Sequence, residues 1–415
     1  MINIIRFKVF LFYLLPIFYI SGPFLSDLSL SLIGLLFIII VLIQKNFLVF
    51  IKKKFSIFFL IFYSILVISS IFSFDFSLSF TQILFYFRYL FFTLGVYYLF
   101  INNHIKFKIL FYIYSFAFFI ICFDIFFEFF FGFNLSLNQT QHDLNHRLSS
   151  FFGEELIAGS FISRFLPILL SIYILSFKEN SNKYVILLTT IVALFSSFLT
   201  GERTGFVLSI ITFIFSSFIL NFSKKTYLVI LISSLMVAVT INSFSTKPFE
   251  RMFLKTFDQL QERSAIKFLP LSKHHEAHAL SALKMYKDSP LIGNGPNSFR
   301  YLCDDYKYYV NLGCSTHPHQ MYIQILSETG TIGFLFIIFV LFYISQQLCL
   351  ILLSNIKEKN ISYLIQSEFF LLLAIFINLF PFLPSNNFFN NWINVMYFLP
   401  FGLYLGVINK KLKNE

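Results

Sequence analysis

Polar side chains precede and enter a long apolar run in the segment CSTHPHQMYIQILSETGTIGFLFIIFVLFY, residues 314–343. Two histidines come first, and three polar residues follow at intervals of four: His317, His319, Gln320, Gln324 and Glu328. Residues four apart share one face of a helix, so the last three would form a stripe in line with the histidines. An isolated histidine here could simply cap the helix. Because polar stripes are rare at membrane depth and imidazole titrates near ambient pH, we instead expect a catalytic site, with His319, His317 and Glu328 as candidates.

A second group of ionisable residues lies between two apolar runs, in the segment TGERTG at 200–205. An arginine is always charged and can grip phosphate oxygens with two parallel hydrogen bonds. We expect a functional role for Arg203, and the family resemblance described below implies that it binds a diphosphate, with Glu202 orienting it. The alternative is an interfacial ion pair between these two neighbours. Arg147 and Arg164 flank another apolar run and are further candidate phosphate ligands, or else ordinary interfacial anchors.

Four other residues have a structural interpretation. Arg88 and Asp124 lie at similar depth in two predicted spans, where an unpaired charge would be costly, so a buried ion pair between them is expected. Cys303 and Cys314 are separated by ten residues in a polar segment, which favours a disulfide. A zinc site that combines these cysteines with the histidines after them is the alternative. Their spacing fits no common zinc pattern, and we expect no metal.

The composition indicates the kind of molecule that holds these residues. The chain has 415 residues, 57% hydrophobic and 12% charged, with a mean hydropathy of +0.77. A soluble protein of this size could not bury so much apolar surface, so we expect an all-helical, polytopic membrane protein. A span needs about 20 mostly apolar residues. Twelve stretches approach this length, near 7–23, 28–43, 55–73, 80–101, 109–131, 156–177, 184–200, 205–221, 226–243, 320–344, 361–383 and 391–408.

The basic residues predict the orientation of these spans. With the N-terminus in the cytoplasm, the inward connections and both ends of the chain carry lysine or arginine. The short connections on the other side hold one basic residue, Arg203. We therefore expect twelve spans with both termini cytoplasmic. The net charge of +11 follows from these connections, and no nucleic-acid partner is expected.

The connections also suggest a domain organisation. We expect a first part with nine spans, a large polar loop subdomain, and a last part with three spans and a cytoplasmic tail: 1–243, 244–319 and 320–415. The first part includes a smaller outer loop at 132–155. Chemistry outside the cytoplasm would lie in the subdomain, which we expect to be mainly helical. Within it, His278, Ala282 and Met285 have helical spacing and predict a short amphipathic helix resting on the membrane surface.

The histidine segment resembles a motif of bacterial O-antigen ligases. The family pattern is His, then Asn, Ser or Gln, then nine residues, Gly, two residues, and Gly, Thr or Tyr. His319, Gln320, Gly330 and Gly333 meet this pattern without a gap. The two glycines would also permit close helix packing.

Three other segments strengthen this resemblance. DSPLIGNGPNSF at 288–299, with Gly293 and Gly295, is similar to a segment shared by O-antigen ligases and the related Wzy-type O-antigen polymerases. TGERTGF is similar to their arginine-bearing turn at the outer end of a span. HRLSSFFGEELIAGSFI at 146–162 is similar to a weaker family segment. The resemblance covers residues 145–345 by motif and the whole chain by topology.

The resemblance implies an enzyme that moves a glycan from undecaprenyl diphosphate to a hydroxyl group, at the periplasmic face of the bacterial inner membrane. In a ligase of lipopolysaccharide biosynthesis the acceptor is a sugar of lipid A–core; in a polymerase it is another lipid-linked glycan. The leaving group is already good, so no nucleotide, metal or other cofactor is implied. His319 would serve as base, Gln320 and Gln324 would line the substrate site, and Arg203 would lead the diphosphate ligands.

Other functions are compatible with the same features. A protein O-glycosylation ligase would use the same kind of donor. A flippase or secondary transporter would place its polar residues near the bilayer midplane, in broken helices. In every case the partners are membrane lipids and the lipid-linked glycan.

One departure from the family concerns the phosphate site. Relatives often carry an arginine about fifteen residues before the proline of the 288–299 segment, and this chain has His275 there. Neighbouring histidines or another arginine could take over that role, and the candidates are His274, His275, His278, Arg251, Arg263 and Arg300. Otherwise the chain binds its donor differently.

Overall fold

The computed structural model describes residues 1–137, 147–223, 239–261, 272–358 and 361–414, together with Lys225, Thr226 and Met236. Every regular element in these residues is a helix, which confirms the all-helical prediction. The helices are α1 (Ile2–Ile20), α2 (Pro23–Ile43), α3 (Phe47–Ile51), α4 (Lys54–Ile71), α5 (Phe76–Ile83), α6 (Arg88–Ile101), α7 (Phe107–Phe131), η1 (Ser150–Phe152), α8 (Ala158–Phe177), η2 (Lys178–Asn180), α9 (Lys183–Leu199), α10 (Arg203–Leu220), α12 (Lys247–Phe249), η3 (Glu250–Leu254), α13 (Lys255–Gln261), α14 (Lys273–Asp288), α15 (Phe299–Leu302), α16 (Met321–Glu358), α17 (Tyr363–Asn378) and α18 (Asn391–Asn414).

The long apolar helices make the chain a polytopic membrane protein. Within the described ranges, nine helical segments are long and apolar enough to cross a membrane: α1, α2, α4, α5 with α6, α7, α8 with η2, α10, α16 and α18. Two shorter apolar helices, α9 and α17, lie at other predicted span positions. The predicted span at 226–243 falls largely outside the described residues. The count of twelve therefore stays a prediction.

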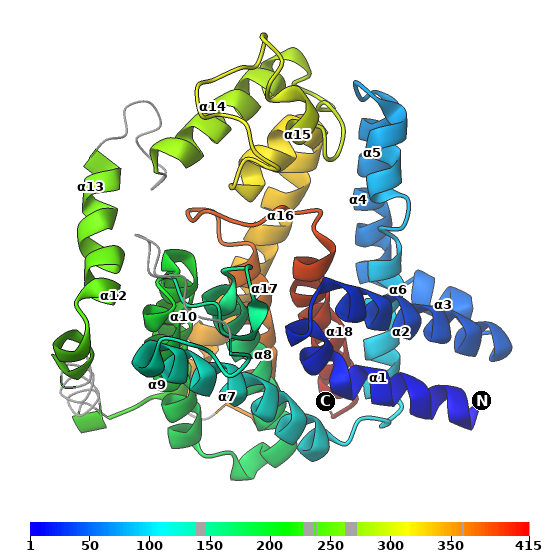
Figure 1. Cartoon of the computed structure of the whole chain (residues 1–415). Coiled ribbons are helices and arrows are strands. Elements are labelled where there is room, and N and C mark those ends of the chain that lie inside the picture. Colours follow the sequence, from blue (N-terminus) through cyan, green and yellow to red (C-terminus); the bar gives the residue numbers. More distant parts are fainter. Residues whose placement is uncertain are drawn as a thin grey trace.

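Helix α8 lies at the centre of the bundle, and all its residues from Ala158 to Ser176 are buried. Helices α7, α9, α10 and α17 pack around it, while α2, α6 and α18 form a second group (Figure 1). The outer helices expose large apolar side chains, among them Phe58 on α4 and Phe342 on α16. A membrane helix satisfies its own backbone hydrogen bonds and can present such side chains to lipid.

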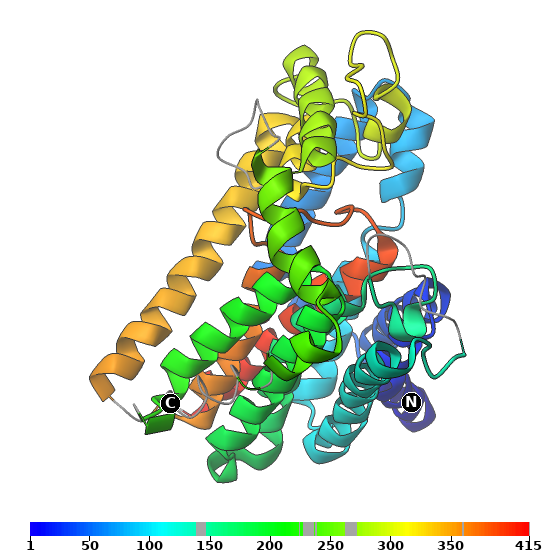
Figure 2. The same ribbon diagram turned by 60° about the vertical axis from the view of Figure 1, so that its left-hand side comes forward.

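One end of the bundle carries the loop subdomain. Figure 1 shows α14 and α15 beside the start of α16, and Figure 2 shows α16 continuing to the opposite end of the molecule. A small second core joins these three helices: Ala279, Met285, Phe299, Cys303 and Ile323. Cys303 and Cys314 form a disulfide with Cα atoms 5.0 Å apart. The disulfide prediction is confirmed, and the two sulfurs, bonded to each other, are not zinc ligands.

The amphipathic helix predicted around His278 exists as α14, but its predicted place on the membrane surface is wrong. Ala282 and Met285 are fully buried in the second core, because α14 packs against α16. The helix begins at Ser272, whose hydroxyl accepts a hydrogen bond from His275 N (3.5 Å). α14 is therefore held by protein contacts, at a defined position beside the start of α16.

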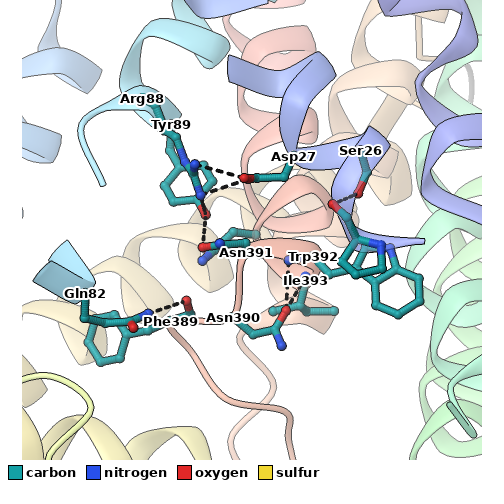
Figure 3. Close-up of polar contacts among 12 residues, drawn as sticks. Ser26, Asp27, Gln82, Arg88, Tyr89, Phe389, Asn390, Asn391, Trp392 and Ile393 are labelled. Atoms are coloured by element: carbon teal, nitrogen blue, oxygen red, sulfur yellow. Dashed lines mark hydrogen bonds and ion pairs between the residues drawn. The ribbon is translucent and has the colours of Figure 1, made fainter. Parts of the chain in front are cut away.

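The predicted ion pair between Arg88 and Asp124 is also wrong. Arg88 Nη2 lies 2.8 Å from Asp27 Oδ1, and Figure 3 shows the Asp27 carboxylate facing this guanidinium. α6 packs against α2, which carries Asp27. Asp124, on α7, instead accepts hydrogen bonds from Leu135 N (2.7 Å) and Ser150 Oγ (2.6 Å). Equal depth in the membrane does not make two helices neighbours.

Polar contacts beside this ion pair fix the α17–α18 connection, residues 379–390, where it leads into α18. Tyr89 Oη donates to Asn391 Oδ1 (3.2 Å), and Gln82 Nε2 donates to Phe389 O (3.2 Å), as Figure 3 shows. The earlier part of the same connection contacts the candidate site. The hydrogen bonds of Tyr89 and Gln82 therefore help to position that site.

Candidate functional site

Four histidine rings gather where α14 meets the segment before α16. His275 and His278 belong to α14, and His317 and His319 lie just before Met321, the first residue of α16. The ring centre of His319 lies 4.0 Å from that of His317, 5.1 Å from that of His275 and 5.4 Å from that of His278. We call these four residues the histidine cluster. His319 is its central member.

The polar partners of the cluster leave some imidazole nitrogens unused. His319 Nε2 lies 3.2 Å from Ser315 Oγ, and His317 Nδ1 lies 3.0 Å from Thr316 Oγ1. His278 Nδ1 and His317 Nε2 are buried and meet no hydrogen-bond geometry in the described part of the chain, although the backbones of Gly313 and Ser385 lie near enough to raise the pKa of His278 and of His317, respectively. Among the described residues, no group of three or more His, Cys, Asp or Glu side chains has a metal-binding arrangement.

Burial keeps these imidazoles neutral. It lowers the pKa of His275 and of His319 to about 4 and that of His317 to about 3, and it also lowers the pKa of His278. The neighbouring imidazoles add to the shift, because each charged ring would repel the next. At neutral pH the rings are uncharged, and a nitrogen lone pair can accept a proton.

A group of arginines surrounds the TGERTG turn. Arg203 Nη1 donates to Gln259 Oε1 (2.5 Å), and its Nη2 donates to Arg251 O (3.3 Å). Arg251 Nε donates to Gly201 O (2.8 Å). Burial, and then the positive charges of Arg147 and Arg203, lower the pKa of Arg251 to about 10. Three guanidinium groups thus lie close enough to act on one another, with the carboxylate of Glu202 offsetting part of their charge, and the net positive charge favours an anion.

Glu202 fixes the turn that carries Arg203. Its carboxylate accepts a hydrogen bond from Ser160 N (2.8 Å) and another from Ser160 Oγ, at the start of α8. Gly159 and Gly205 allow this contact, since a Cβ on Gly205 would lie 2.4 Å from Gly159 C. In the described residues, the carboxylate of Glu202 therefore bonds to α8. Glu202 positions the turn rather than pairing with the guanidinium of Arg203.

The α17–α18 connection joins the histidine cluster to the arginines. Thr204 Oγ1 donates to Pro384 O (3.3 Å), and the next residue, Ser385, donates its backbone N–H to His319 O (2.9 Å). The charge of Arg203 also contributes to the lowered pKa of His275. The two groups of side chains therefore adjoin. The role of Ser385 was not evident from the sequence, where PSNNFFN shows only the polar composition of a turn.

The polar stripe on α16 anchors two loops. Gln320 Nε2 donates to Pro381 O (2.7 Å), and Gln324 Oε1 accepts from Phe388 N (3.0 Å). One turn further on, the carboxyl oxygens of the buried Glu328 accept hydrogen bonds from the backbone N–H groups of two residues of the 288–299 segment: Asn297 (3.0 Å) and Phe299 (3.2 Å). All three stripe residues therefore hold loops in place around the site.

The two glycine motifs fit against each other. Gly330 has a φ of +69°, and a Cβ there would lie 2.3 Å from Leu291 C. Gly293 has a φ of +81°, and its Cβ would lie 2.4 Å from Glu328 C. Gly295 N donates to Glu328 O (2.9 Å). Residues without a side chain are needed at these positions, because the backbone of the 288–299 segment lies directly on the kink in α16. In addition, a Cβ on Gly333 would lie 2.0 Å from Thr329 Oγ1.

The remaining candidates lie in different surroundings. Arg147 donates to Leu156 O and lies among the arginines around the turn. Arg164 is buried within α8, where its Nη1 lies 3.5 Å from Ser160 O. His274 and Arg300 are exposed. Arg263 lies outside the described residues.

Comparison with known families gives one result that bears on this site. The family model of O-antigen ligase (Wzy_C) matches residues 188–338, a range that holds Arg203, the histidine cluster, the 288–299 segment and the glycines of α16. Among curated proteins, none matches the chain. Residues 188–338 thus match an O-antigen ligase domain, and this match supports the O-antigen ligase superfamily for the part of the chain that it covers.

Proposed function

We propose that this protein is an O-antigen ligase. It transfers a glycan from undecaprenyl diphosphate to a hydroxyl group of a lipid A–core sugar, at the periplasmic face of the inner membrane. The observation that carries this proposal is the junction of a neutral histidine cluster with a group of arginines, inside a ligase domain. Catalysis of this transfer needs a base for the acceptor and positive charge for the leaving diphosphate.

In the proposed reaction the acceptor oxygen attacks the anomeric carbon of the glycan. The bond between this carbon and the diphosphate oxygen breaks, and undecaprenyl diphosphate leaves with the bonding electrons. The acceptor's proton passes to the imidazole of His319, which lies against the neighbouring rings and whose backbone carbonyl accepts a hydrogen bond from Ser385 N. His317, with its unused Nε2, is the second candidate for this role.

Arg203 is the proposed leading ligand of the diphosphate, with Arg147 and Arg251 adding positive charge. A guanidinium can hold phosphate oxygens through two parallel hydrogen bonds. The charge of Arg203 acts on the neutral His275, and we propose that His275 donates one hydrogen bond to the same diphosphate. Arg251 thus supplies part of the charge that relatives place near position 275. We do not assign Glu328, Gln320 or Gln324 a direct part, since their contacts support the loops.

The placement of these residues at helix ends supports transfer rather than transport. Arg203 is the first residue of α10, and His319 precedes the first residue of α16. In the orientation that the basic residues predict, both face the periplasm, with both termini in the cytoplasm. We further propose that residues 244–319 form a subdomain that supplies the histidine cluster and Arg251 to the site, between the spans of 1–243 and those of 320–415.

The polymerase of the same superfamily remains the second candidate, because the matching family model does not separate the two acceptors. A strain that lacks the gene distinguishes them when surface lipopolysaccharide and undecaprenyl-linked glycan are both resolved by size. A ligase predicts long glycan left on undecaprenyl and bare lipid A–core. Single repeat units on undecaprenyl, with cores that carry at most one unit, would instead identify a polymerase. An unchanged pattern in both pools would contradict both.

A further inference from the structure

A polar cavity of about 300 Å³ lies at the other end of the bundle from His319. The ends of α8, α10 and α16 and the beginnings of α9 and α17 surround it, and the far end of α16 in Figure 2 marks its position. Its polar lining includes two lysines, three amides and a phenol: Lys178, Lys183, Asn221, Asn355, Gln366 and Tyr363. None of these residues takes part in the site proposed for glycan transfer.

Hydrogen bonds hold part of the polar wall in place. Asn355 Nδ2 donates to Phe218 O (3.2 Å) and Ile219 O (3.3 Å), and Asn355 Oδ1 accepts from Asn221 Nδ2 (3.4 Å). Gln366 Nε2 donates to Ile361 O (3.1 Å). Because these side chains are already positioned, little conformational entropy would be lost when a ligand binds.

The charge of the cavity is positive. Among the described residues, the ion pairs involve neither Lys178 nor Lys183. Lys183 Nζ lies 5.4 Å from the ring centre of Phe222, a contact that leaves its N–H groups available. Among the described lining residues, Glu179 is the one carboxylate, and it offsets half of the charge of the two lysines. An ammonium pair beside a phenol and amides suits a small oxyanion.

We propose that this cavity binds a phosphate ester anion, carried by a phospholipid headgroup or free in solution. The basic connections predict that this end of the bundle faces the cytoplasm, where membranes present anionic headgroups. Ile186, Ile219 and Leu220 line the cavity beside the polar groups, so a headgroup could enter with its glycerol portion against them. Bound lipid would tie the ends of the surrounding helices together, which stabilises the fold by mass action.

The test measures the melting temperature of the full chain in detergent with added phosphatidylglycerol, phosphatidylcholine or inorganic phosphate. We expect phosphatidylglycerol to raise Tm more than phosphatidylcholine does, at equal concentration. The double variant Lys178→Ala, Lys183→Ala should weaken the apparent affinity for phosphatidylglycerol roughly 25-fold, because each lysine near a charged headgroup contributes on the order of a fivefold effect. Gln366→Glu, which adds a negative charge with little change in shape, should weaken it as well.

The matched control is the double variant Lys52→Ala, Lys54→Ala, which removes two exposed charges that are predicted to face the same side of the membrane but lie outside the cavity. It should respond to lipid as the wild type does. Chloride at the same concentration serves as the comparison for inorganic phosphate. If phosphate raises Tm more than chloride does, and the cavity variants lose this difference, the ligand is free phosphate. The proposal would be overturned if phosphatidylglycerol raised Tm equally in the wild type and both cavity variants. It would also be overturned if phosphatidylglycerol stabilised the protein no more than phosphatidylcholine, and phosphate no more than chloride. Glycan transfer is not used as a readout, so this test is independent of the proposed function.

Discussion

At the scale of single residues, the unusual feature is a set of histidines kept neutral by burial and by one another. For a histidine whose pKa is lowered in the folded protein, the unfolded chain binds the proton more readily. The histidine cluster therefore costs stability as the pH falls from about 6.5 towards 4, the value to which burial lowers the pKa of His319. At neutral pH this cost is absent, and the imidazole of His319 is available as a base.

The first prediction concerns the pH dependence of transfer. The rate should stay constant from neutral pH to about pH 5 and be half lost near the lowered pKa of His319, about 4. His278→Asn should move this midpoint upward, because the charge of His278 contributes to the lowered pKa of His319. The measurement is transfer rate against pH, with activity re-measured after return to neutral pH to separate titration from unfolding.

The control for this prediction is His274→Asn, which removes an exposed histidine from the same helix. Its pH profile should match that of the wild type. A wild-type midpoint near 6.5, or an unchanged midpoint in His278→Asn, would contradict the interpretation of the cluster.

At the scale of elements, the carboxyl group of Glu328 has a supporting role. Glu328→Gln would turn an amide N–H towards one of two backbone donors, Asn297 N or Phe299 N, and leave it unpaired. The expected cost is about 1–3 kcal/mol of unfolding free energy, with an unchanged pH profile of transfer. Thermal unfolding measures it, and the exposed Glu154→Gln serves as the control. If Glu328→Gln kept a normal Tm but changed the pH dependence of the transfer rate, Glu328 would instead be a catalytic group.

The junction of α16 with the 288–299 segment makes a separate prediction. Gly330→Ala adds a Cβ 2.3 Å from Leu291 C at a φ of +69°. Gly132→Ala meets similar backbone strain, at a φ of +77°, but has no atom within 4 Å of its Cβ. We expect roughly 1–2 kcal/mol of destabilisation for Gly132→Ala and clearly more for Gly330→Ala. Equal melting temperatures for the two variants would contradict the close fit of the two motifs.

The elements also show what the sequence could predict. Apolar length and turn residues locate the long helices, and local cysteine spacing predicts the disulfide, because these features depend on near neighbours in the chain. The partner of Arg88 could not be predicted, since it depends on which helices pack together. The stripe of Gln320, Gln324 and Glu328 shows its common face in the sequence, but not the loops that cover that face. For the same reason the link from His319 to Ser385 emerged only from the fold.

At the scale of the whole molecule, we propose that the glycan site and the phosphate cavity lie at opposite faces of one membrane. Cysteine labelling tests this with Tyr306→Cys, at a residue that is 93% exposed in the loop subdomain, and Lys413→Cys near the C-terminus. The background is Cys349→Ser, because Cys122 is buried and the other two cysteines are bonded. In spheroplasts an impermeant maleimide should label position 306 at once and position 413 only after permeabilisation. The reverse pattern would contradict the orientation.

The central claim is that His319 accepts the acceptor's proton while Arg203 holds the diphosphate, and purified protein tests it most directly. Donor binding and transfer would be measured separately with undecaprenyl-diphosphate-linked glycan and lipid A–core. We expect His319→Ala to bind donor as the wild type does but to transfer it at least about 100-fold more slowly. Arg203→Ala should bind donor more weakly, whereas Lys287→Ala, an exposed charge on α14, should change neither quantity. Transfer by His319→Ala within a few-fold of wild type, or undiminished donor binding by Arg203→Ala, would contradict it.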